Sequence, residues 1–157
     1  GAGRAVVECE LAFENGTYAM DFDAWDAQMT GNERMLILCS PHNPGGRVWT
    51  ASELQGVAAF CKRHDLILVS DEIHHDLVLG GQKHLPMALI DGISERLVMM
   101  TATTKTFNIA GGHSGWAAIG APGCWALSLS SSVSENASWT MQTPGQSSIG
   151  RLNLRLR

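Results

Sequence analysis

The sequence lacks several features that define whole classes of protein. Its 157 residues have a formal net charge of −4 at pH 7, so no basic surface for nucleic acid is expected. No apolar run approaches the roughly 20 residues that a membrane-spanning helix needs. The opening residues, GAGRAVVECE, contain no apolar core of a secretory signal. We therefore expect a soluble, cytoplasmic protein without a nucleic-acid or membrane partner.

Cysteine pairs at the spacing of metal sites or redox motifs are absent as well. The four cysteines stand far apart, with no CxxC pair among them. We expect them to be small apolar side chains in a reducing compartment, because neither a zinc site nor a disulfide framework fits this spacing. They are Cys9, Cys39, Cys61 and Cys124.

Three short apolar runs are present, and they predict strands. They are MLILC at 35–39, LILVS at 66–70 and LVMMT at 97–101. Each shows little polar alternation, which is typical of parallel strands that are covered on both faces of a sheet. A helical segment between the first two would complete a right-handed βαβ unit.

Two segments predict helices that flank this sheet. Residues 50–65 begin with Thr50, and Glu53 follows three residues later, which together form a capping box for a helix start. Residues 21–29 have acidic residues in what would be their first turn. The predicted fold class is therefore α/β, with a mostly parallel sheet and flanking helices.

The chain divides into two parts by composition. Residues 1–120 alternate strand-like and helix-like segments, whereas residues 121–157 are dense in serine and contain a single acidic residue, Glu135. No helical or strand period persists in the second part, which is typical of weakly determined structure. We expect residues 121–157 to be a poorly ordered tail.

Polar side chains follow each of the three predicted strands. Asn43 lies in the loop SPHNPGG after the first strand, Asp71 and His74 lie in DEIHHD after the second, and Lys105 lies in ATTKTFN after the third. Ligands bind at the carboxyl ends of strands in parallel sheets. An amide, a carboxylate, an imidazole and an amine are thus expected at one edge of the sheet.

Each of these residues also has a plainer interpretation. Asn43 could shape a turn, Asp71 could cap a helix, His74 could lie on a helix surface, and Lys105 could be a solvated lysine. Metal binding is another alternative for one cluster, although no HExxH motif is present and Lys105 would stay unexplained. The potential ligands of that cluster are Asp71, Glu72, His74, His75 and Asp76.

The combination of NPGG, SDEIH and TTKTFNIAGG resembles the large domain of fold-type I pyridoxal-phosphate enzymes. The resemblance covers residues 4–120 and is greatest to the MalY/PatB-type C–S lyases, the cystathionine β-lyases. It implies that residues 1–120 are a partial large domain. Residues 121–157 do not resemble the family, so a truncated or frame-shifted end is expected there.

The resemblance also implies a role for each residue at the strand ends. Lys105 would form the Schiff base with pyridoxal phosphate, Asp71 would pair with the pyridine nitrogen, and Asn43 would hydrogen-bond the phenolic oxygen. His74 takes the place of a tyrosine of related aminotransferases. The hydroxyls of Thr103 and Thr104 could hold the phosphate. No metal is expected.

The chain departs from the family pattern in two places. Many relatives have Ser-x-Ser before the lysine, where this chain has Ala102 and Thr104, so the phosphate could also contact Thr101 or Thr103. Where aminotransferases usually have a phosphate-binding arginine, this chain has His113. Family members are also more than twice this length.

The implied activity is β-elimination from cystathionine or another S-substituted cysteine, with an amino acid as the small-molecule substrate and a homodimer as the full-length form. Two alternatives stay open. The first is a pyridoxal-phosphate-dependent aminotransferase. The second is a non-catalytic remnant, or a fragment that only binds a partner.

Overall fold

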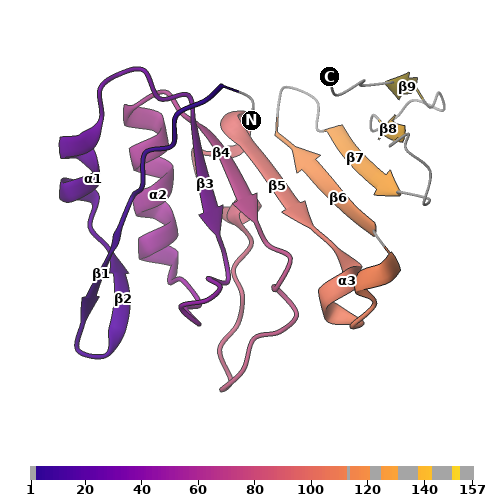
Figure 1. Cartoon of the computed structure of the whole chain (residues 1–157), viewed down its shortest axis with the longest axis horizontal. Coiled ribbons are helices and arrows are strands. Elements are labelled where there is room, and N and C mark those ends of the chain that lie inside the picture. The colour runs from indigo at the N-terminus through magenta and orange to yellow at the C-terminus, as the bar shows by residue number, and fades with distance from the viewer. Residues whose placement is uncertain (1–2, 113, 121–124, 131–137, 143–149, 153–157) are drawn as a thin grey trace.

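The computed structural model describes residues 3–112, 114–120, 125–130, 138–142 and 150–152. Its strands and helices alternate through the first two thirds of the chain (Figure 1). In chain order, the elements are β1 (Leu11–Glu14), β2 (Thr17–Met20), α1 (Phe22–Gln28), β3 (Met35–Cys39), α2 (Ala51–Arg63), β4 (Ile67–Asp71), the 3-10 turns η1 (Met87–Leu89) and η2 (Ser94–Arg96), β5 (Leu97–Thr101), α3 (Thr103–Thr106), η3 (Ala110–Gly112), β6 (Ser114–Ile119), β7 (Trp125–Ser130), β8 (Ser138–Gln142) and β9 (Gly150–Leu152).

The main sheet has the strand order β3-β4-β5-β6-β7-β8-β9. β4 pairs in parallel with β3 on one side and with β5 on the other, whereas each pair from β5–β6 onward is antiparallel. The α/β class is confirmed, and the sheet is mixed. Its parallel part consists of the three strands that the apolar runs predict.

The predicted elements agree closely with the observed ones. β3 and β5 have the expected bounds, and β4 runs one residue later than expected, so that Asp71 is its last residue. The capping box of α2 is confirmed, because Glu53 N donates to Thr50 Oγ1 (3.3 Å) and Thr50 N donates to Glu53 Oε2 (2.7 Å).

The hairpin of β1 and β2 was not predicted, although the sequence contains its signal. The two strands pair antiparallel around Asn15 and Gly16, which both have positive φ angles (51° and 77°). Asn-Gly is the dipeptide most typical of such a two-residue hairpin turn, because both residues tolerate this conformation.

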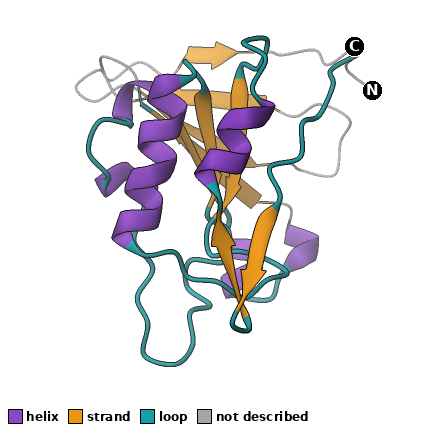
Figure 2. Ribbon diagram, turned by 90° about the vertical axis from the view of Figure 1, so that its left-hand side faces the viewer, coloured by secondary structure: helices purple, strands orange, loops and turns teal. Residues whose placement is uncertain are grey.

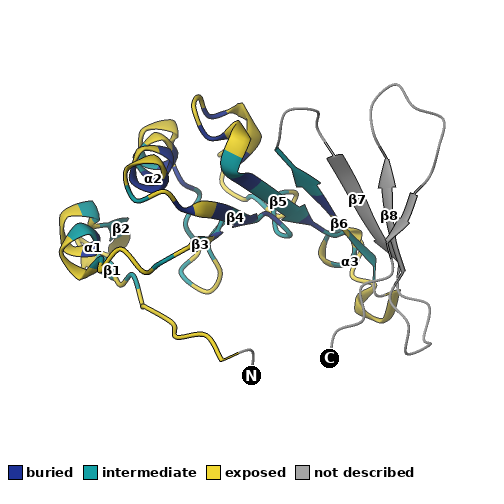
Figure 3. Cartoon of the chain, turned by 90° about the horizontal axis from the view of Figure 1, so that it is seen from above, coloured by how far each residue is buried: buried dark blue, intermediate teal, exposed yellow. Residues whose placement is uncertain are grey.

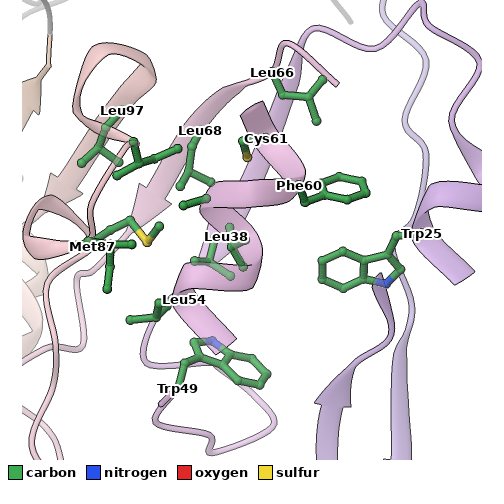
Figure 4. Packing of buried hydrophobic residues seen from close by; sticks show 14 residues of the cluster. Trp25, Leu38, Trp49, Leu54, Phe60, Cys61, Leu66, Leu68, Met87 and Leu97 are labelled. Carbon is green, nitrogen blue, oxygen red and sulfur yellow. The ribbon is translucent and has the colours of Figure 1, made fainter. Parts of the chain in front are cut away.

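The hydrophobic core lies between α2 and the parallel strands. The buried residues of α2 include Leu54, which lies with Leu38 of β3 and Leu68 of β4 on the side of the sheet, and Phe60, which points toward Trp25 of α1 (Figure 4). Figure 3 shows buried residues concentrated along β4 and on α2. Burying each such side chain stabilises the fold by about 1.5–3 kcal/mol, which holds α2 on this face of the sheet.

Helix α1 extends this core on the outer side of α2. The two helices lie beside each other in front of the strands in Figure 2. Trp25 of α1 meets Phe60 of α2 with ring centroids 5.7 Å apart, close to perpendicular, and its indole nitrogen donates to Glu10 O (2.8 Å). Aromatic pairs prefer this edge-to-face arrangement to a face-to-face sandwich, because the edge of one ring is positive and the face of the other is negative.

The second part of the chain contains three strands, β7, β8 and β9, which no periodic pattern of the sequence predicts. The other residues of 121–157 lie outside the described part. The expectation of a poorly ordered or frame-shifted tail therefore stays a prediction. Among the described helices, none is long and apolar enough to cross a membrane.

Candidate active site

The parallel strands bring the predicted polar residues to one edge of the sheet. Cys39, Asp71 and Met100 lie in one register row across β3, β4 and β5. Asn43 follows four residues after Cys39, and Lys105 follows five residues after Met100. The three strands point the same way in Figure 1, and α3 lies beyond the end of β5. The candidate residues thus all belong to the carboxyl edge of the parallel strands.

The loop that carries Asn43 is held by its own backbone. Ser40 N donates to Asp71 O (2.9 Å), which joins the start of the loop to the end of β4. Asn43 N donates to Cys39 Sγ (3.3 Å), and His42 N donates to Arg47 O (2.7 Å). The side chain of Asn43 is exposed. Its amide is therefore free to meet a ligand from a fixed loop.

Asp71, the last residue of β4, and Glu72, which follows it, are carboxylates with different surroundings. Glu72 is buried, accepts from Ser70 Oγ (2.8 Å) and Met87 N (3.0 Å), and lies 2.7 Å from His84 Nε2. Asp71 is half-buried, and within the described residues its carboxylate accepts one hydrogen bond, from Ile73 N (3.2 Å). Successive side chains of a strand point to opposite faces. Glu72 is thus a structural residue, whereas Asp71 has an oxygen left for a ligand.

His74 has a ring nitrogen without a partner. Its Nδ1 atom is buried and forms no hydrogen bond with any residue that the structure describes. A buried polar atom left in this state costs about 1–3 kcal/mol unless a water, an ion or a ligand satisfies it. His74 follows Asp71 by three residues, in the loop after β4.

Lys105 lies in α3 and is exposed in this chain. Its amine forms no ion pair or hydrogen bond with the residues in the described ranges. The amine is therefore accessible from solvent. This exposure agrees with the plainer interpretation of Lys105 as a solvated lysine, and it also leaves the amine open to a ligand.

The threonines before and beside Lys105 have different surroundings. Thr101 is buried, and its hydroxyl lies 3.0 Å from His75 Nδ1 and 3.4 Å from Glu72 O, so it is engaged within the protein. Thr103 is exposed and lies 2.7 Å from Ser114 Oγ, and Thr104 is half-buried. Thr103 and Thr104 stay the candidates for a phosphate. His113 lies outside the described residues.

Sequence reasoning missed a contact between α3 and the loop after β4. Thr106 Oγ1 donates to Asp76 Oδ2 (2.8 Å), and His75 Nε2 lies 3.3 Å from the same oxygen. The sequence suggested Asp76 and His75 only as metal ligands. Within the described residues, no group of three or more histidine, cysteine, aspartate or glutamate side chains is arranged to hold a metal ion.

The groups at this edge fit an aromatic cofactor with a cationic ring nitrogen, a carbonyl group and an anionic tail. Asp71 offers a carboxylate oxygen, His74 an unpartnered buried nitrogen, Asn43 an exposed amide, and Lys105 an accessible amine. Such a set belongs to the class of enzymes that hold a carbonyl cofactor on a lysine at the strand ends of an α/β sheet.

The chain belongs to the family of class I and II aminotransferases, whose family model matches residues 1–149. This match confirms the resemblance that the motifs indicate. It extends beyond residue 120, into the segment for which no family likeness was expected.

Two curated relatives illustrate the range of this family. Cystathionine β-lyase PatB of Bacillus subtilis is 41% identical over 111 residues, which are 69% of this chain and 29% of the relative. Kynurenine–oxoglutarate transaminase 3 of Mus musculus is 33% identical over 139 residues, which are 88% of this chain and 30% of the relative. The chain thus spans less than a third of each.

Solved structures show the same range of coverage. Cystalysin from Treponema denticola, which contains pyridoxal 5′-phosphate, matches with a TM-score of 0.72 and 40% identity over 76% of this chain and 31% of its own. A pyridoxal-phosphate-bound C–S lyase from Staphylococcus hominis matches with a TM-score of 0.66 and 36% identity over 70% of this chain and 28% of its own. The cofactor that the resemblance implies is thus the cofactor of these structures.

Proposed function

We propose that this chain contributes the cofactor-binding part of a pyridoxal-phosphate-dependent C–S lyase. The observation that supports it best is the placement of Asp71, which ends β4 between the loop of Asn43 and the helix of Lys105. The unpartnered buried nitrogen of His74 adds to it. The reaction would be β-elimination from cystathionine or another S-substituted cysteine, with a thiol, pyruvate and ammonia as products.

Pyridoxal phosphate supplies an aldehyde and an electron-accepting ring when it is bound. The carboxylate of Asp71 would keep a proton on the ring nitrogen, because a negative charge close by favours the cationic form. The amide of Asn43 would donate to the phenolic oxygen. The hydroxyls of Thr103 and Thr104 would donate to the phosphate.

Lys105 would act twice in this reaction. Its amine would hold the cofactor through the aldehyde group that pyridoxal phosphate supplies, a condensation that releases water. Once the substrate has displaced it, the free amine would take the proton from the substrate's Cα. The C–S bond then breaks, the electron pair leaves with sulfur, and the sulfur takes up a proton. Water converts the remaining three-carbon fragment to pyruvate and ammonia.

An aminotransferase is the second candidate, because transaminases are also similar to this chain. Besides the mouse enzyme, probable N-succinyldiaminopimelate aminotransferase DapC of Mycobacterium tuberculosis is 37% identical over 74% of this chain. His74 favours the lyase, since the resemblance gives aminotransferases a tyrosine at this position.

Pyruvate release distinguishes the two candidates. The full-length parent protein should release pyruvate from cystathionine without any keto-acid acceptor. Turnover that depends strictly on an acceptor would support the aminotransferase instead. A parent that binds pyridoxal phosphate at neither Lys105 nor another lysine would leave only the partner-binding role.

We further propose that the full-length parent is a cytoplasmic homodimer. Phe107 and Ile109, which directly follow the helix of Lys105, are 66% and 49% exposed, so apolar surface lies beside the site. Exposed apolar surface of this kind commonly marks an interface. Sedimentation of the parent as a monomer at micromolar concentration would contradict this proposal.

A further inference from the structure

Helix α3, which carries Lys105, has few means of holding its own position. It spans only four residues, and its N-cap residue, Ala102, has no side chain that could cap it. A single helical turn is not stable by itself, because nucleation fixes several residues in exchange for one hydrogen bond. The orientation of Lys105 therefore depends on the contacts that α3 makes with the rest of the protein.

Two threonine hydroxyls supply side-chain contacts at the two ends of α3. Thr103 Oγ1 lies 2.7 Å from Ser114 Oγ at the start of β6. Thr106 Oγ1 donates to Asp76 Oδ2 (2.8 Å) in the loop after β4. Lys105 lies between these two anchors in the sequence. The Thr106 contact is the stronger of the two, since its acceptor is a carboxylate.

Asp76 belongs to a loop that is itself fixed to the sheet. Its neighbour His75 lies 3.3 Å from the Asp76 carboxylate through Nε2, and its Nδ1 atom lies 2.8 Å from Glu72 O. Glu72 is anchored in the core by Ser70 and Met87. Asp71 immediately precedes this segment. The bond from Thr106 to Asp76 thus joins the helix of Lys105 to the segment that directly follows Asp71.

We propose that Asp76 and Thr106 are positioning residues for Lys105. Their hydrogen bond sets where the amine lies relative to Asp71, and neither residue touches the cofactor. This inference rests on the proposed function, since it concerns the same lysine. It assigns a role to two residues that the motifs of the family resemblance leave without one.

The test uses the full-length parent protein freed of its cofactor. Thr106→Val removes the hydroxyl and keeps the shape, whereas Thr106→Ser keeps the hydroxyl. The rate at which a visible absorbance band forms after addition of pyridoxal phosphate reports on Lys105 directly, and the circular dichroism of that band reports on how the ring is held. Turnover and KM are measured in parallel.

Thr106→Val should slow band formation and kcat about tenfold, which is the size of effect expected for one hydrogen bond to a charged group. It should also change the circular dichroism of the band and leave KM within about twofold. Thr106→Ser should restore all of these. Asp76→Ala should slow band formation at least as much as Thr106→Val, because it also removes the contact of the carboxylate with His75 Nε2. The double variant should be no slower than Asp76→Ala alone, because the bond to Thr106 is already lost in that variant.

The matched control is Thr30→Val. Thr30 Oγ1 donates to Glu33 Oε1 at the same distance, 2.8 Å, in an exposed turn that is not part of the candidate site. This control should lower the thermal midpoint about as much as Thr106→Val and leave band formation unchanged. If Thr106→Val fails to fold, Asp76→Ala makes the same test.

Three results would overturn the inference: unchanged kinetics in Thr106→Val, equal loss in Thr106→Ser, or additive losses in the double variant. If one of these results is obtained and the wild-type protein is still labelled at Lys105, only this inference fails and the proposed function stands. A wild-type protein that forms no band and carries no borohydride-stable label on Lys105 would overturn the proposed function and this inference together.

Discussion

The same three parallel strands build two very different regions. On the side that faces α2, apolar side chains such as Leu68 and Leu54 are fully buried and belong to one hydrophobic cluster. At the carboxyl edge, Asn43 and Lys105 are exposed, and their side chains make no hydrogen bond with the described residues. One region thus stabilises the fold, whereas the other leaves its polar groups available.

Two adjacent residues show this division within one strand end. Glu72 has three polar partners and lies inside the protein, whereas Asp71 has one and lies at the surface of the edge. Both are carboxylates, so their different partners follow from where each side chain lies and from the extra methylene of Glu72. The comparison teaches that stability and chemistry are assigned to different residues here. A substitution at one of these regions should therefore change either the stability or the chemistry, and leave the other property nearly unchanged.

The largest difference between the effect on chemistry and the effect on stability is expected at Lys105. In the full-length parent, Lys105→Ala should abolish the borohydride-stable pyridoxal-phosphate label on the peptide TATTKTFN. The unfolding free energy should change by less than about 0.5 kcal/mol, because an exposed side chain contributes little packing. Peptide mapping and urea unfolding check the two parts. Lys62→Ala and Lys83→Ala are the controls, and labelling spread evenly over all three lysines would show that the site is wrong.

The opposite result, a large loss of stability, is expected at Phe60. Phe60→Ala should lower the unfolding free energy of the chain by about 3–5 kcal/mol, because the cavity forms in a fully buried site between Trp25 and the strands. Urea unfolding followed by tryptophan fluorescence measures this loss. The matched control is Phe107→Ala, since Phe107 is 66% exposed and its loss should cost little. Equal losses at both positions would break the division between core and edge.

Asp71 should show an intermediate effect that is confined to chemistry. In the full-length parent, Asp71→Asn should weaken pyridoxal-phosphate binding and slow proton removal from the substrate by about tenfold to hundredfold, because an opposite charge shifts the pKa of a nearby group by about 1–3 units. Equilibrium dialysis and the rate of deuterium exchange at the substrate's Cα measure the two. Asp91→Asn, at an exposed turn, is the control, and an equal loss there would mean that general charge is responsible.

A smaller effect on stability alone is expected at the capping box of α2. Thr50→Ala should cost about 1 kcal/mol, because it leaves the amide of Glu53 without its partner. Thr50→Ser should keep most of that stability, since it retains the oxygen. Urea midpoints of the three proteins check the series. A serine variant as unstable as the alanine variant would assign the effect to the methyl group instead.

The sequence predicts the parallel strands and α2 well because their signals are local. The apolar runs at β3 and β5 and the pair Thr50 and Glu53 are each short patterns with one physical meaning. The common edge of Asn43, Asp71 and Lys105 also follows, since parallel strands end together. The hairpin at Asn15 had a local signal that was overlooked.

Other features have no local signal. Thr106 and Asp76 are 30 residues apart, and their bond depends on how the loop after β4 lies against α3. The unpartnered nitrogen of His74 likewise depends on tertiary packing. Contacts of this kind arise only once the strands are assembled, so no spacing in the sequence indicates them.

The smallest expected effect concerns an ion pair between α1 and the end of α2. Asp26 of α1 lies 2.6 Å from His64 Nε2 and 2.8 Å from an Arg63 nitrogen, both at the end of α2. The hydrogen bond from His64, with the charge and hydrogen bond of Arg63, lowers the pKa of Asp26 from its ordinary value of 3.8. A lowered folded-state pKa means that its stabilising effect is fully present above the unfolded-state value.

That contribution should be lost as the pH falls below about 4 and passes through the lowered pKa of the folded state. Asp26→Asn should therefore lower the urea midpoint slightly at pH 6, and the difference from wild type should shrink toward pH 2. Asp23→Asn is the control, because Asp23 is on the same helix, is exposed, and pairs with no cation among the described residues. A difference that stays constant over this range would show that Asp26 acts through shape and not through its charge.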